Sequence, residues 1–296
     1  MVAPMIDPVS SPFLVPFDSG WRIERAATAP PEDKPKKKTC KARLGEAVEQ
    51  LAELQRKLYA HDRYSLLLVF QAMDAAGKDS TIRNVLSGVN PAGCQVSCFK
   101  KPSHEEYDHD FLWRHVKRLP ERGRIGVFNR SHYESVLVVR VHPEYLGGER
   151  LPYQPDDLDA LWQQRYESIR GHERHLARNG TVILKFFLHV GRDEQRDRFL
   201  ARLEDPSKNW KFSAGDLGER ALWDDYMGAY EDALNATSRP WAPWYAIPAD
   251  DKPYMRMVVA ELVVRALESL DMDYPRLSDD DREQLKTYKQ RLEGGE

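Results

Sequence analysis

The 296-residue sequence predicts a three-layer α/β/α fold, in which a mostly parallel five-stranded sheet lies between two layers of helices. Short, continuous apolar runs recur along the chain, and such runs are typical of strands buried on both faces of a parallel sheet. Amphipathic stretches with helical spacing lie between them. We expect the strands in SLLLVFQ (65–71), CQVSCF (94–99), RIGVFN (124–129), TVILKFFLHV (181–190) and WYAIP (244–248).

Helical stretches account for the two outer layers. Residues 41–64 place leucine and valine at helical spacing, and residues 251–271 predict a long closing helix. The stretches 109–119 and 158–180 are amphipathic, and the second ends at Gly180, as a helix with a glycine C-cap would.

The two ends of the chain differ from this pattern. Residues 1–40 hold several prolines and end in a lysine run, which predicts an irregular N-terminal arm. Residues 276–296 are rich in charge and predict a polar C-terminal tail. We therefore expect one domain over residues 41–275.

Composition argues against several classes of protein. With 41% hydrophobic residues and a net charge of −3, the chain resembles neither a disordered protein nor a dedicated nucleic-acid binder. Cys40, Cys94 and Cys98 show neither a disulfide framework nor the spacing of zinc ligands. No apolar run approaches the ~18 residues of a membrane span, and no cation precedes Arg22 as a secretory signal requires. We expect a cytoplasmic protein without a nucleic-acid or membrane partner.

A phosphate-binding loop, or Walker A motif, is indicated after the first strand. In QAMDAAGKDST, Gly77 would let the backbone approach a phosphate, Lys78 would supply charge, and the next helix would point its N-terminus at the anion. Ala72 replaces the usual first glycine, and Asp79 replaces the usual hydroxyl residue. The alternative is a plain strand–turn–helix corner. Candidate phosphate- or nucleotide-binding residues are Ala75, Ala76, Gly77, Lys78, Asp79, Ser80, Thr81 and Arg83, with His132 as a polar neighbour from the third strand end.

Charged and polar residues at the ends of two strands are the candidate catalytic groups, together with Lys78. Asp74, inside the loop, would repel phosphates unless it holds a metal ion or accepts a proton. Asn129 and Arg130 end the third strand, where open α/β sheets bind ligands, and Arg130 could neutralise a transferring phosphoryl group. Glu134 could supply a further carboxylate, although Ser131 to Glu134 also matches a helix capping box.

A helical lid is expected at about residues 191–217. Arg198 and Arg202 are four residues apart and would share a helix face, and Lys208 and Lys211 follow them. A movable cationic cover would exclude the water that competes with the acceptor in phosphoryl transfer. The alternative is an ordinary solvated charged face.

Other polar residues are expected to be structural. Lys185 lies within an apolar strand and is expected to be a paired core lysine. His172 and His175 are three residues apart but lack a third ligand, which argues against a metal site.

Six ordered blocks resemble the family-2 polyphosphate kinases: MDAAGKDST, FNRSHYE, ERHLARNGTVILKFFLHV, EQRDRFLARLEDPSKNWKFS, GD at 215–216 and APWYAIPADDK. The likeness covers roughly residues 41–271. It implies the P-loop kinase fold, inorganic polyphosphate as phosphoryl donor, and Mg²⁺, with Mn²⁺ as an alternative, as cofactor. It also implies a homo-dimer or homo-tetramer.

The resemblance assigns roles to individual residues. It implies that Asp74 activates the acceptor phosphate or holds magnesium, with Asn129 or Glu134 as further candidate ligands. It implies that Lys78, Arg130 and the four lid cations grip phosphates. Many members carry Asp at the place of Asn129 and Asn at that of Glu134; the pairing here resembles the branch that accepts both AMP and ADP. This departure leaves the base and the metal ligands open.

The leading hypothesis is reversible, Mg²⁺-dependent transfer of phosphoryl groups from polyphosphate to AMP or ADP, with guanine nucleotides as alternative acceptors. A polyanionic donor needs an extended track of cations, for which the candidates are Lys101, Arg114, Lys117, Arg118 and Arg122. The first alternative is an ATP-dependent nucleoside monophosphate kinase. An alternative of another class is a non-catalytic protein that binds polyphosphate or nucleic acid through basic patches.

Overall fold

The computed structural model describes residues 6–152 and 156–295. Its centre is a five-stranded sheet in the order β2-β3-β1-β4-β5, and every neighbouring pair is parallel. The α/β fold predicted from the sequence is confirmed, and the sheet is fully rather than mostly parallel. The strands are β1 (Ser65–Gln71), β2 (Cys94–Cys98), β3 (Ile125–Asn129), β4 (Thr181–His189) and β5 (Trp244–Pro248).

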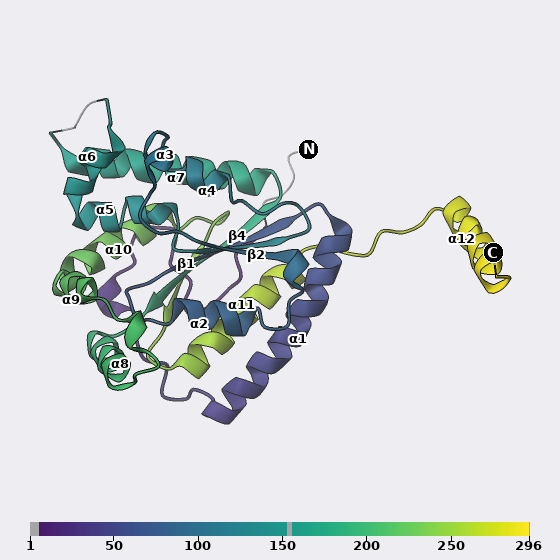
Figure 1. Ribbon diagram of the computed structural model, residues 1–296, viewed down its shortest axis with the longest axis horizontal. Helices are drawn as coiled ribbons and strands as arrows, with labels where there is room; N and C mark the ends of the chain where they lie inside the picture. Colours follow the sequence, from purple (N-terminus) through teal and green to yellow (C-terminus); the bar gives the residue numbers. More distant parts are fainter. Residues whose placement is uncertain (1–5, 153–155, 296) are drawn as a thin grey trace.

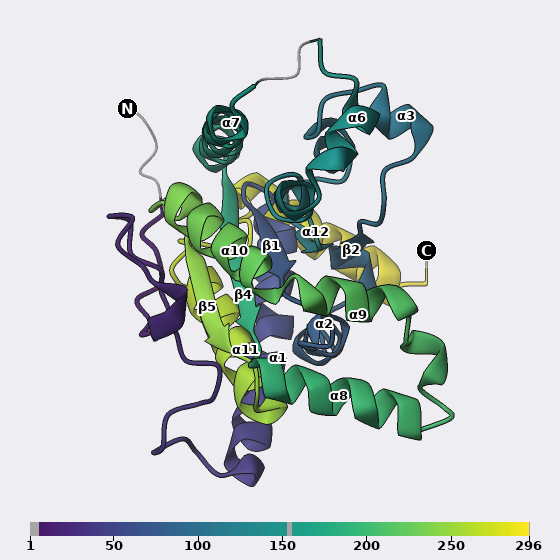
Figure 2. The same ribbon diagram turned by 90° about the vertical axis from the view of Figure 1, so that its left-hand side faces the viewer.

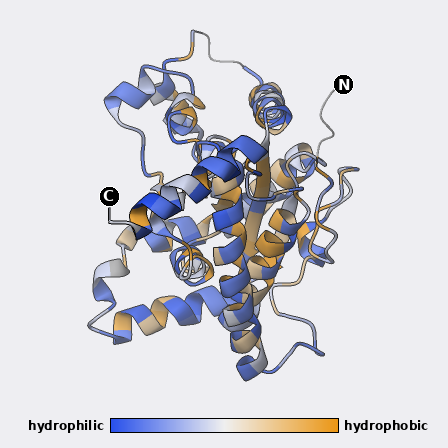
Figure 3. Cartoon of the chain, turned by 90° about the vertical axis from the view of Figure 1, so that its right-hand side faces the viewer, coloured by the Kyte–Doolittle hydropathy of each residue, from blue (hydrophilic) through white to orange (hydrophobic). Residues whose placement is uncertain are grey.

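Helices cover both faces of the sheet and complete three layers (Figure 1). One face carries α1 (Lys37–His61), α2 (Lys78–Val85) and α11 (Lys252–Glu268), and the other carries α7 (Leu158–Arg178) and α10 (Trp223–Thr237). Every residue of β1 and β5 is buried, as a central parallel sheet requires. Apolar residues concentrate on the strands and the inward helix faces (Figure 3).

Short helices connect these elements. The expected helix over 109–119 is wrong in extent, because only Trp113–Val116 is helical. The Asp110 side chain accepts a hydrogen bond from Leu112 N (2.9 Å), which forms a turn just before that helix. The short helices are α3 (His104–Tyr107), α4 (Trp113–Val116), α5 (Val138–Val141) and α6 (Leu146–Glu149), and the 3₁₀ segments are η1 (Ile23–Arg25), η2 (Pro91–Gly93), η3 (His132–Ser135), η4 (Pro143–Tyr145) and η5 (Asn209–Lys211).

The N-terminal arm is more ordered than predicted. Val15 N donates to the Trp244 carbonyl (2.9 Å) and Ala246 N to the Phe13 carbonyl (2.8 Å), so the arm runs along β5. Helix α1 begins at Lys37, four residues before the expected domain boundary, immediately after the Pro35–Lys36 segment.

The C-terminal tail is polar, as predicted, but it is also helical. Helix α12 (Asp279–Glu293) is capped by Ser278, whose hydroxyl accepts a hydrogen bond from Asp281 N (3.1 Å). The helix stands away from the body of the molecule (Figure 1). In the described ranges, no helix is long and apolar enough to cross a membrane.

The lid region consists of two helices joined by a segment that contains η5. Helix α8 (Arg192–Glu204) follows β4, and α9 (Ala214–Ala221) leads into α10. Figure 2 shows α8 and α9 beside α2, which starts at the phosphate loop. The two helices therefore lie at the carboxyl-terminal edge of the sheet, where the predicted site residues also lie.

Lys185 confirms the structural interpretation made from the sequence. It is fully buried in β4, and its Nζ donates to Glu173 Oε2 (2.7 Å), Tyr133 Oη (2.7 Å) and the Thr237 carbonyl (2.9 Å). Each proton of the ammonium group has an acceptor, so a charge that burial would otherwise penalise is stabilised. The network joins β4, α7, η3 and the end of α10.

Candidate active site

The loop between β1 and α2 has the backbone of an anion site. In the described part of the chain, the N–H groups of Asp74, Ala75 and Gly77 have no hydrogen-bond acceptor. Ala75 (φ 63°) and Gly77 (φ 111°) adopt left-handed conformations that turn these amides. Ala72 has no positive φ, so the backbone does not require the glycine that the motif usually has there. The free amides and the N-terminus of α2 together form a cradle for an anion.

Lys78 lies at the entrance of this cradle. Its Nζ donates to the Ala72 carbonyl (2.7 Å), which folds the side chain back over the loop. Burial and the nearby Arg130 lower the pKa of Lys78 to about 8, although Asp74 acts in the opposite direction. A bound phosphate would favour the charged form and could draw the ammonium away from the carbonyl.

The hydroxyl groups beyond Lys78 have structural partners. Ser80 Oγ donates to the Gly77 carbonyl (2.9 Å). Thr81 is fully buried, and its Oγ1 lies 3.9 Å from Met255 Sδ. The Thr81 side chain is therefore buried against α11, and its role in ligand binding stays a prediction. Arg83 is exposed on α2.

Arg130 joins the two predicted catalytic carboxylates. Its Nη2 donates to Asp74 Oδ1 (2.9 Å), and its Nη1 donates to Glu134 Oε2 (3.0 Å). The adjacent carboxyl ends of β1 and β3 explain this meeting, since Arg130 N donates to the Phe70 carbonyl (3.0 Å). The charge of Glu134 and then that of Asp74 raise the pKa of Arg130, while burial opposes them. Arg130 itself has a left-handed backbone (φ 62°), which costs energy in a non-glycine residue.

Asn129 lies beside the start of α2. Its Nδ2 donates to Asp79 Oδ1 (2.6 Å), so the residue that replaces the usual motif hydroxyl has a partner on β3. The same amide group lies 3.7 Å from Cys98 Sγ at the end of β2. Asn129 and Asp79 thus border the loop, as predicted, and link β3 to α2.

Glu134 does not form a capping box with Ser131. The Ser131 hydroxyl accepts a hydrogen bond from Tyr133 N (3.2 Å), but the Glu134 carboxylate contacts Arg130 instead of returning to the backbone of Ser131. The structure therefore favours a site role for Glu134 over a capping box.

His132 does not line the site. It is 2% exposed, and its Nε2 lies 3.5 Å from Glu173 Oε1 in the buried network below β3. The side chains of Arg130 and Glu134 are only partly buried and pair with each other, whereas His132 between them is buried. The prediction of a polar site liner is wrong for this residue.

The lid cations are positioned differently from the prediction. Arg198 is buried against the outer side of the loop, and its guanidinium donates to backbone carbonyls. Arg202 lies 3.6 Å from Asp216 Oδ2, and Lys208 forms an ion pair with Asp205. The side chain of Lys211 is outside the part of the structure that is described. Burial and then the negative charge of Asp74 raise the pKa of Asp216, the acidic partner of Arg202.

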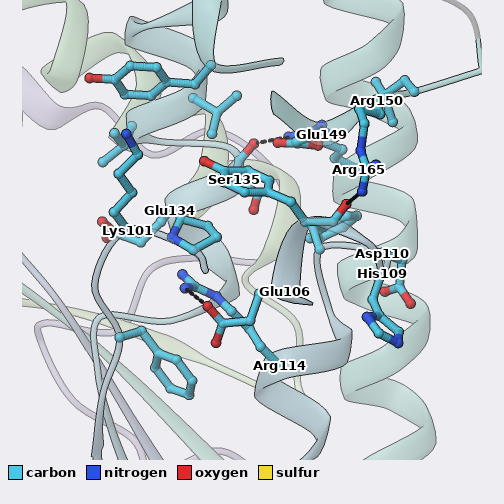
Figure 4. Close-up of a pocket in the computed structure, with 18 of the residues that line it drawn as sticks. Lys101, Glu106, His109, Asp110, Arg114, Glu134, Ser135, Glu149, Arg150 and Arg165 are labelled. Carbon is cyan, nitrogen blue, oxygen red and sulfur yellow. Dashed lines mark hydrogen bonds and ion pairs between the residues drawn. The ribbon is translucent and has the colours of Figure 1, made fainter. Parts of the chain in front are cut away.

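Arg130 and Glu134 line a cavity of about 1110 Å³. Figure 4 shows Glu134 among the residues around it. Apolar side chains such as Phe99, Phe111 and Leu161 line part of it, and Lys101 and Arg114 add positive charge. Figure 4 shows Arg114 directed toward Glu106, to which it donates a hydrogen bond (3.4 Å).

Only some of the cations predicted to form a track line this cavity. Lys101 and Arg114 line the cavity, whereas Lys117, Arg118 and Arg122 do not. Lys117 lies over the Trp113 ring and Arg122 donates to the Arg63 carbonyl (2.6 Å). These three residues are therefore not part of a track through this cavity.

Several residues close to the site were missed from the sequence. Asp216 on α9 interacts electrostatically with the candidate catalytic residue Asp74, whose negative charge, after burial, raises the pKa of Asp216. Tyr230 on α10 is buried, and its pKa is raised by that burial and by Glu134. Gln195 contacts the loop backbone. Of these three residues, only Asp216 had a signal in the sequence, the GD pair at 215–216. Tyr230 and Gln195 lie on ordinary amphipathic helices.

Comparison with known proteins identifies the family. The model of the family "Polyphosphate kinase 2 (PPK2)" matches residues 34–275. The chain belongs to the polyphosphate kinase 2 family. This confirms the resemblance seen in the sequence and the predicted reaction class, polyphosphate-dependent phosphorylation of nucleotides by a phosphotransferase.

Relatives of this family span most of the chain. An "ADP-polyphosphate phosphotransferase" of Rhodopseudomonas palustris is 57% identical over 83% of this chain and 85% of its own length. An "AMP/ADP-polyphosphate phosphotransferase" of Meiothermus ruber is 49% identical over 77% of this chain and 80% of its own. The crystal structure of polyphosphate kinase 2 from Arthrobacter aurescens TC1 superposes with a TM-score of 0.85 at 38% identity, covering 97% of this chain and 99% of that one.

Proposed function

We propose that this enzyme transfers phosphoryl groups reversibly from inorganic polyphosphate to both AMP and ADP. The observation that carries the proposal is the position of Arg130 and Glu134, which border the phosphate loop and also line the large cavity. A donor held by the loop and an acceptor held in the cavity would meet at this pair. The names of the Rhodopseudomonas and Meiothermus relatives support the acceptors.

Unpaired cations beside the loop support a polyanionic donor. In the described ranges, Arg83 on α2 and Lys252 and Arg256 on α11 form no ion pair, and Arg256 Nε is buried without a partner. Burial and then the positive charge of Arg83 lower the pKa of Arg256. Such mutual repulsion is relieved when an anion binds, which favours a ligand with several negative charges.

The cavity suits an acceptor nucleotide. It combines an apolar, aromatic lining with a few charged groups, which is the usual composition of a small-molecule site. Phe99 and Phe111 could contact a base, while Lys101 and Arg114 could contact phosphates. AMP and ADP differ by one phosphate, and the volume of about 1110 Å³ leaves room for either.

Catalysis would then depend on positioning and charge neutralisation. The loop amides and Lys78 would hold the donor phosphates. Arg130 would neutralise the transferring group, and Asp74 would orient the attacking phosphate of the acceptor. The ion pairs of Arg130 with Asp74 and Glu134 hold its guanidinium in place before substrate arrives.

Asp74, with Glu134 or Asn129, would hold a magnesium ion, because Mg²⁺ is often held by one or two carboxylates and substrate phosphates. The carboxylates of Asp74 and Glu134 converge on the same guanidinium. In residues 6–152 and 156–295, no group of three or more His, Cys, Asp or Glu could hold a metal by itself, so phosphates would complete the ligand set. Bound Mg²⁺, or Mn²⁺ in its place, would supply charge neutralisation at the phosphate oxygens.

A donor and acceptor screen tests the function. Polyphosphate or ATP would be offered to AMP, ADP, GMP and GDP, with Mg²⁺, with Mn²⁺ or with a chelator. We expect ADP and ATP from AMP and polyphosphate, dependence on the metal, and a weaker response to guanine nucleotides. Transfer only from ATP would identify a nucleoside monophosphate kinase, and binding without any transfer would identify a non-catalytic protein. Analytical ultracentrifugation would test the predicted dimer or tetramer.

A further inference from the structure

Two side chains of α8 hold the outer side of the phosphate loop. Gln195 Nε2 donates to the Asp74 carbonyl (3.0 Å). Arg198 Nη1 donates to the carbonyls of Ala75 (3.0 Å) and Ala76 (2.7 Å). Three consecutive carbonyl groups of the loop are therefore bound from one helix.

The remaining contacts of Arg198 leave nothing for a phosphate. Its Nη2 donates to the carbonyls of Ala249 (2.6 Å) and Asp250 (3.3 Å), and its Nε donates to Glu194 Oε1 (2.6 Å). The residue is 8% exposed. A direct grip on substrate would require several of these bonds to break.

Gln195 is equally well held. It is 1% exposed, and Arg220 on α9 donates to its Oε1 (2.7 Å). That contact occupies the amide oxygen, so the amide nitrogen faces the loop. Gln195 can thus act as a donor to Asp74 without turning.

The orientation of these carbonyls decides what the loop can bind. A carbonyl oxygen that points at a phosphate repels it, whereas an N–H attracts it. Ala75 has a left-handed backbone (φ 63°) although it is not glycine, and this conformation needs outside support. With the carbonyls of Asp74, Ala75 and Ala76 bound outside, the amides of Asp74, Ala75 and Gly77 remain free on the other side.

We propose that Gln195 and Arg198 are positioning residues, which keep the loop carbonyls turned away from the donor phosphates so that the loop amides can bind them. The inference rests on the proposed role of the loop in holding polyphosphate. It also assigns α8 to the support of the loop. A movement of α8 as a unit would have to break the contacts of both side chains.

The experiment uses two conservative variants of the full-length enzyme. Gln195→Glu keeps the shape and the Arg220 contact but replaces the N–H donor by a carboxylate oxygen, which faces the Asp74 carbonyl. Arg198→Lys keeps the charge but cannot reproduce the planar set of donors. The matched controls are Gln163→Glu, exposed on α7, and Arg196→Lys, exposed on α8.

Binding of inorganic triphosphate and of ADP would be measured separately by calorimetry, with kcat, KM and thermal melting for each variant. We expect each variant to bind triphosphate about tenfold more weakly, roughly the loss of one hydrogen bond to an anion. Binding of ADP should stay unchanged, and kcat should fall. A general structural defect would weaken both ligands, and would contradict the inference.

The outcomes separate this inference from the proposed function. If the wild type binds triphosphate and Lys78→Ala does not, the loop is the phosphate site. Wild-type triphosphate affinity in the folded Gln195→Glu and Arg198→Lys variants would then overturn the positioning role alone. Retained affinity in Arg198→Lys with a loss in Arg198→Gln would indicate a direct charge contact instead, and would also overturn it. If Lys78→Ala binds triphosphate as the wild type does, both the function proposed for the loop and this inference are wrong.

Discussion

Replacing Asp74 by Asn should separate catalysis from stability. The amide keeps an oxygen that can accept the hydrogen bond from Arg130 Nη2, now 2.9 Å from the carboxylate, but it removes the charge. Arg130 retains Glu134 at 3.0 Å, so its guanidinium is not left unpaired. The Arg130 and Asp74 side chains are 38% and 32% exposed. For such a solvent-screened pair, we expect the free energy of unfolding to fall by no more than about 1 kcal/mol.

The effect on turnover should be much larger. If Asp74 orients the acceptor or holds the metal, its loss should lower kcat by about 10²–10⁴-fold, the range for a positioned acid or base. That range corresponds to about 2.7–5.4 kcal/mol of transition-state stabilisation. The thermal midpoint should change by only a few degrees, at about 2–4 °C per kcal/mol for a chain approaching this size.

The assay couples ATP formation from ADP, polyphosphate and Mg²⁺ to luminescence. Polyphosphate binding, measured separately by calorimetry, should survive the substitution because the loop amides and Lys78 are intact. Asp197→Asn, an exposed change on α8, serves as the control. Near-wild-type kcat in Asp74→Asn, or a loss of activity that follows a large drop in the thermal midpoint, would refute this role for Asp74.

Four further outcomes are expected. Lys78→Ala should abolish turnover and weaken polyphosphate binding. In the wild type, kcat/KM for polyphosphate should fall as the pH rises through about 8, because Lys78 of the free enzyme loses its proton there. A flat pH profile would argue against a charged Lys78. Lys185→Met leaves Glu173 buried without its ion-pair partner and should lower the free energy of unfolding by about 3–5 kcal/mol in urea titrations; unchanged stability would mean that the pair is dispensable. Burial opposes protonation of His142, but Glu219 and Glu144 outweigh burial and raise the His142 pKa. The contribution of His142 to stability should therefore be complete below about pH 6.5 and disappear as the pH rises through the higher pKa of the folded state. Thermal melts of His142→Gln should lack this pH-dependent change in the midpoint. Arg256→Gln should weaken polyphosphate binding and reduce its salt dependence without changing ADP binding, and an unchanged salt dependence would exclude Arg256 from the donor path.

The elements of the fold were predictable where one local pattern decides the structure. The strands at 65–71 and 181–190 are continuous apolar runs with no polar face, and only a buried parallel sheet uses such runs well. The helix at 109–119 failed because the Asp110 turn interrupts it. The C-terminal helix was not predicted because most of its residues are charged or polar and α12 has no buried residue.

The candidate site was predictable only in part. Asn129 ends β3 and Arg130 follows it, while Gly77 and Lys78 begin the helix that the loop after β1 leads into. The carboxyl ends of neighbouring parallel strands must meet. Arg198 and Arg202 share a helix in the sequence, but nothing in that spacing tells whether the helix faces solvent, substrate or the loop. The structure turns Arg198 toward the loop carbonyls.

The sequence alone therefore determined the layered fold and the family, because these depend on residues close together in the chain or in a fixed order. Only the tertiary structure decided which charges are paired. It joined Arg130 to Asp74 across 56 residues and Arg198 to Ala75 across 123. Ion pairs and hydrogen bonds depend on distance in space, and a linear sequence does not contain that distance. For the same reason, the unusual place of Asp74 in the loop marked it as a candidate site residue, whereas its partner Arg130 could be identified only from the structure.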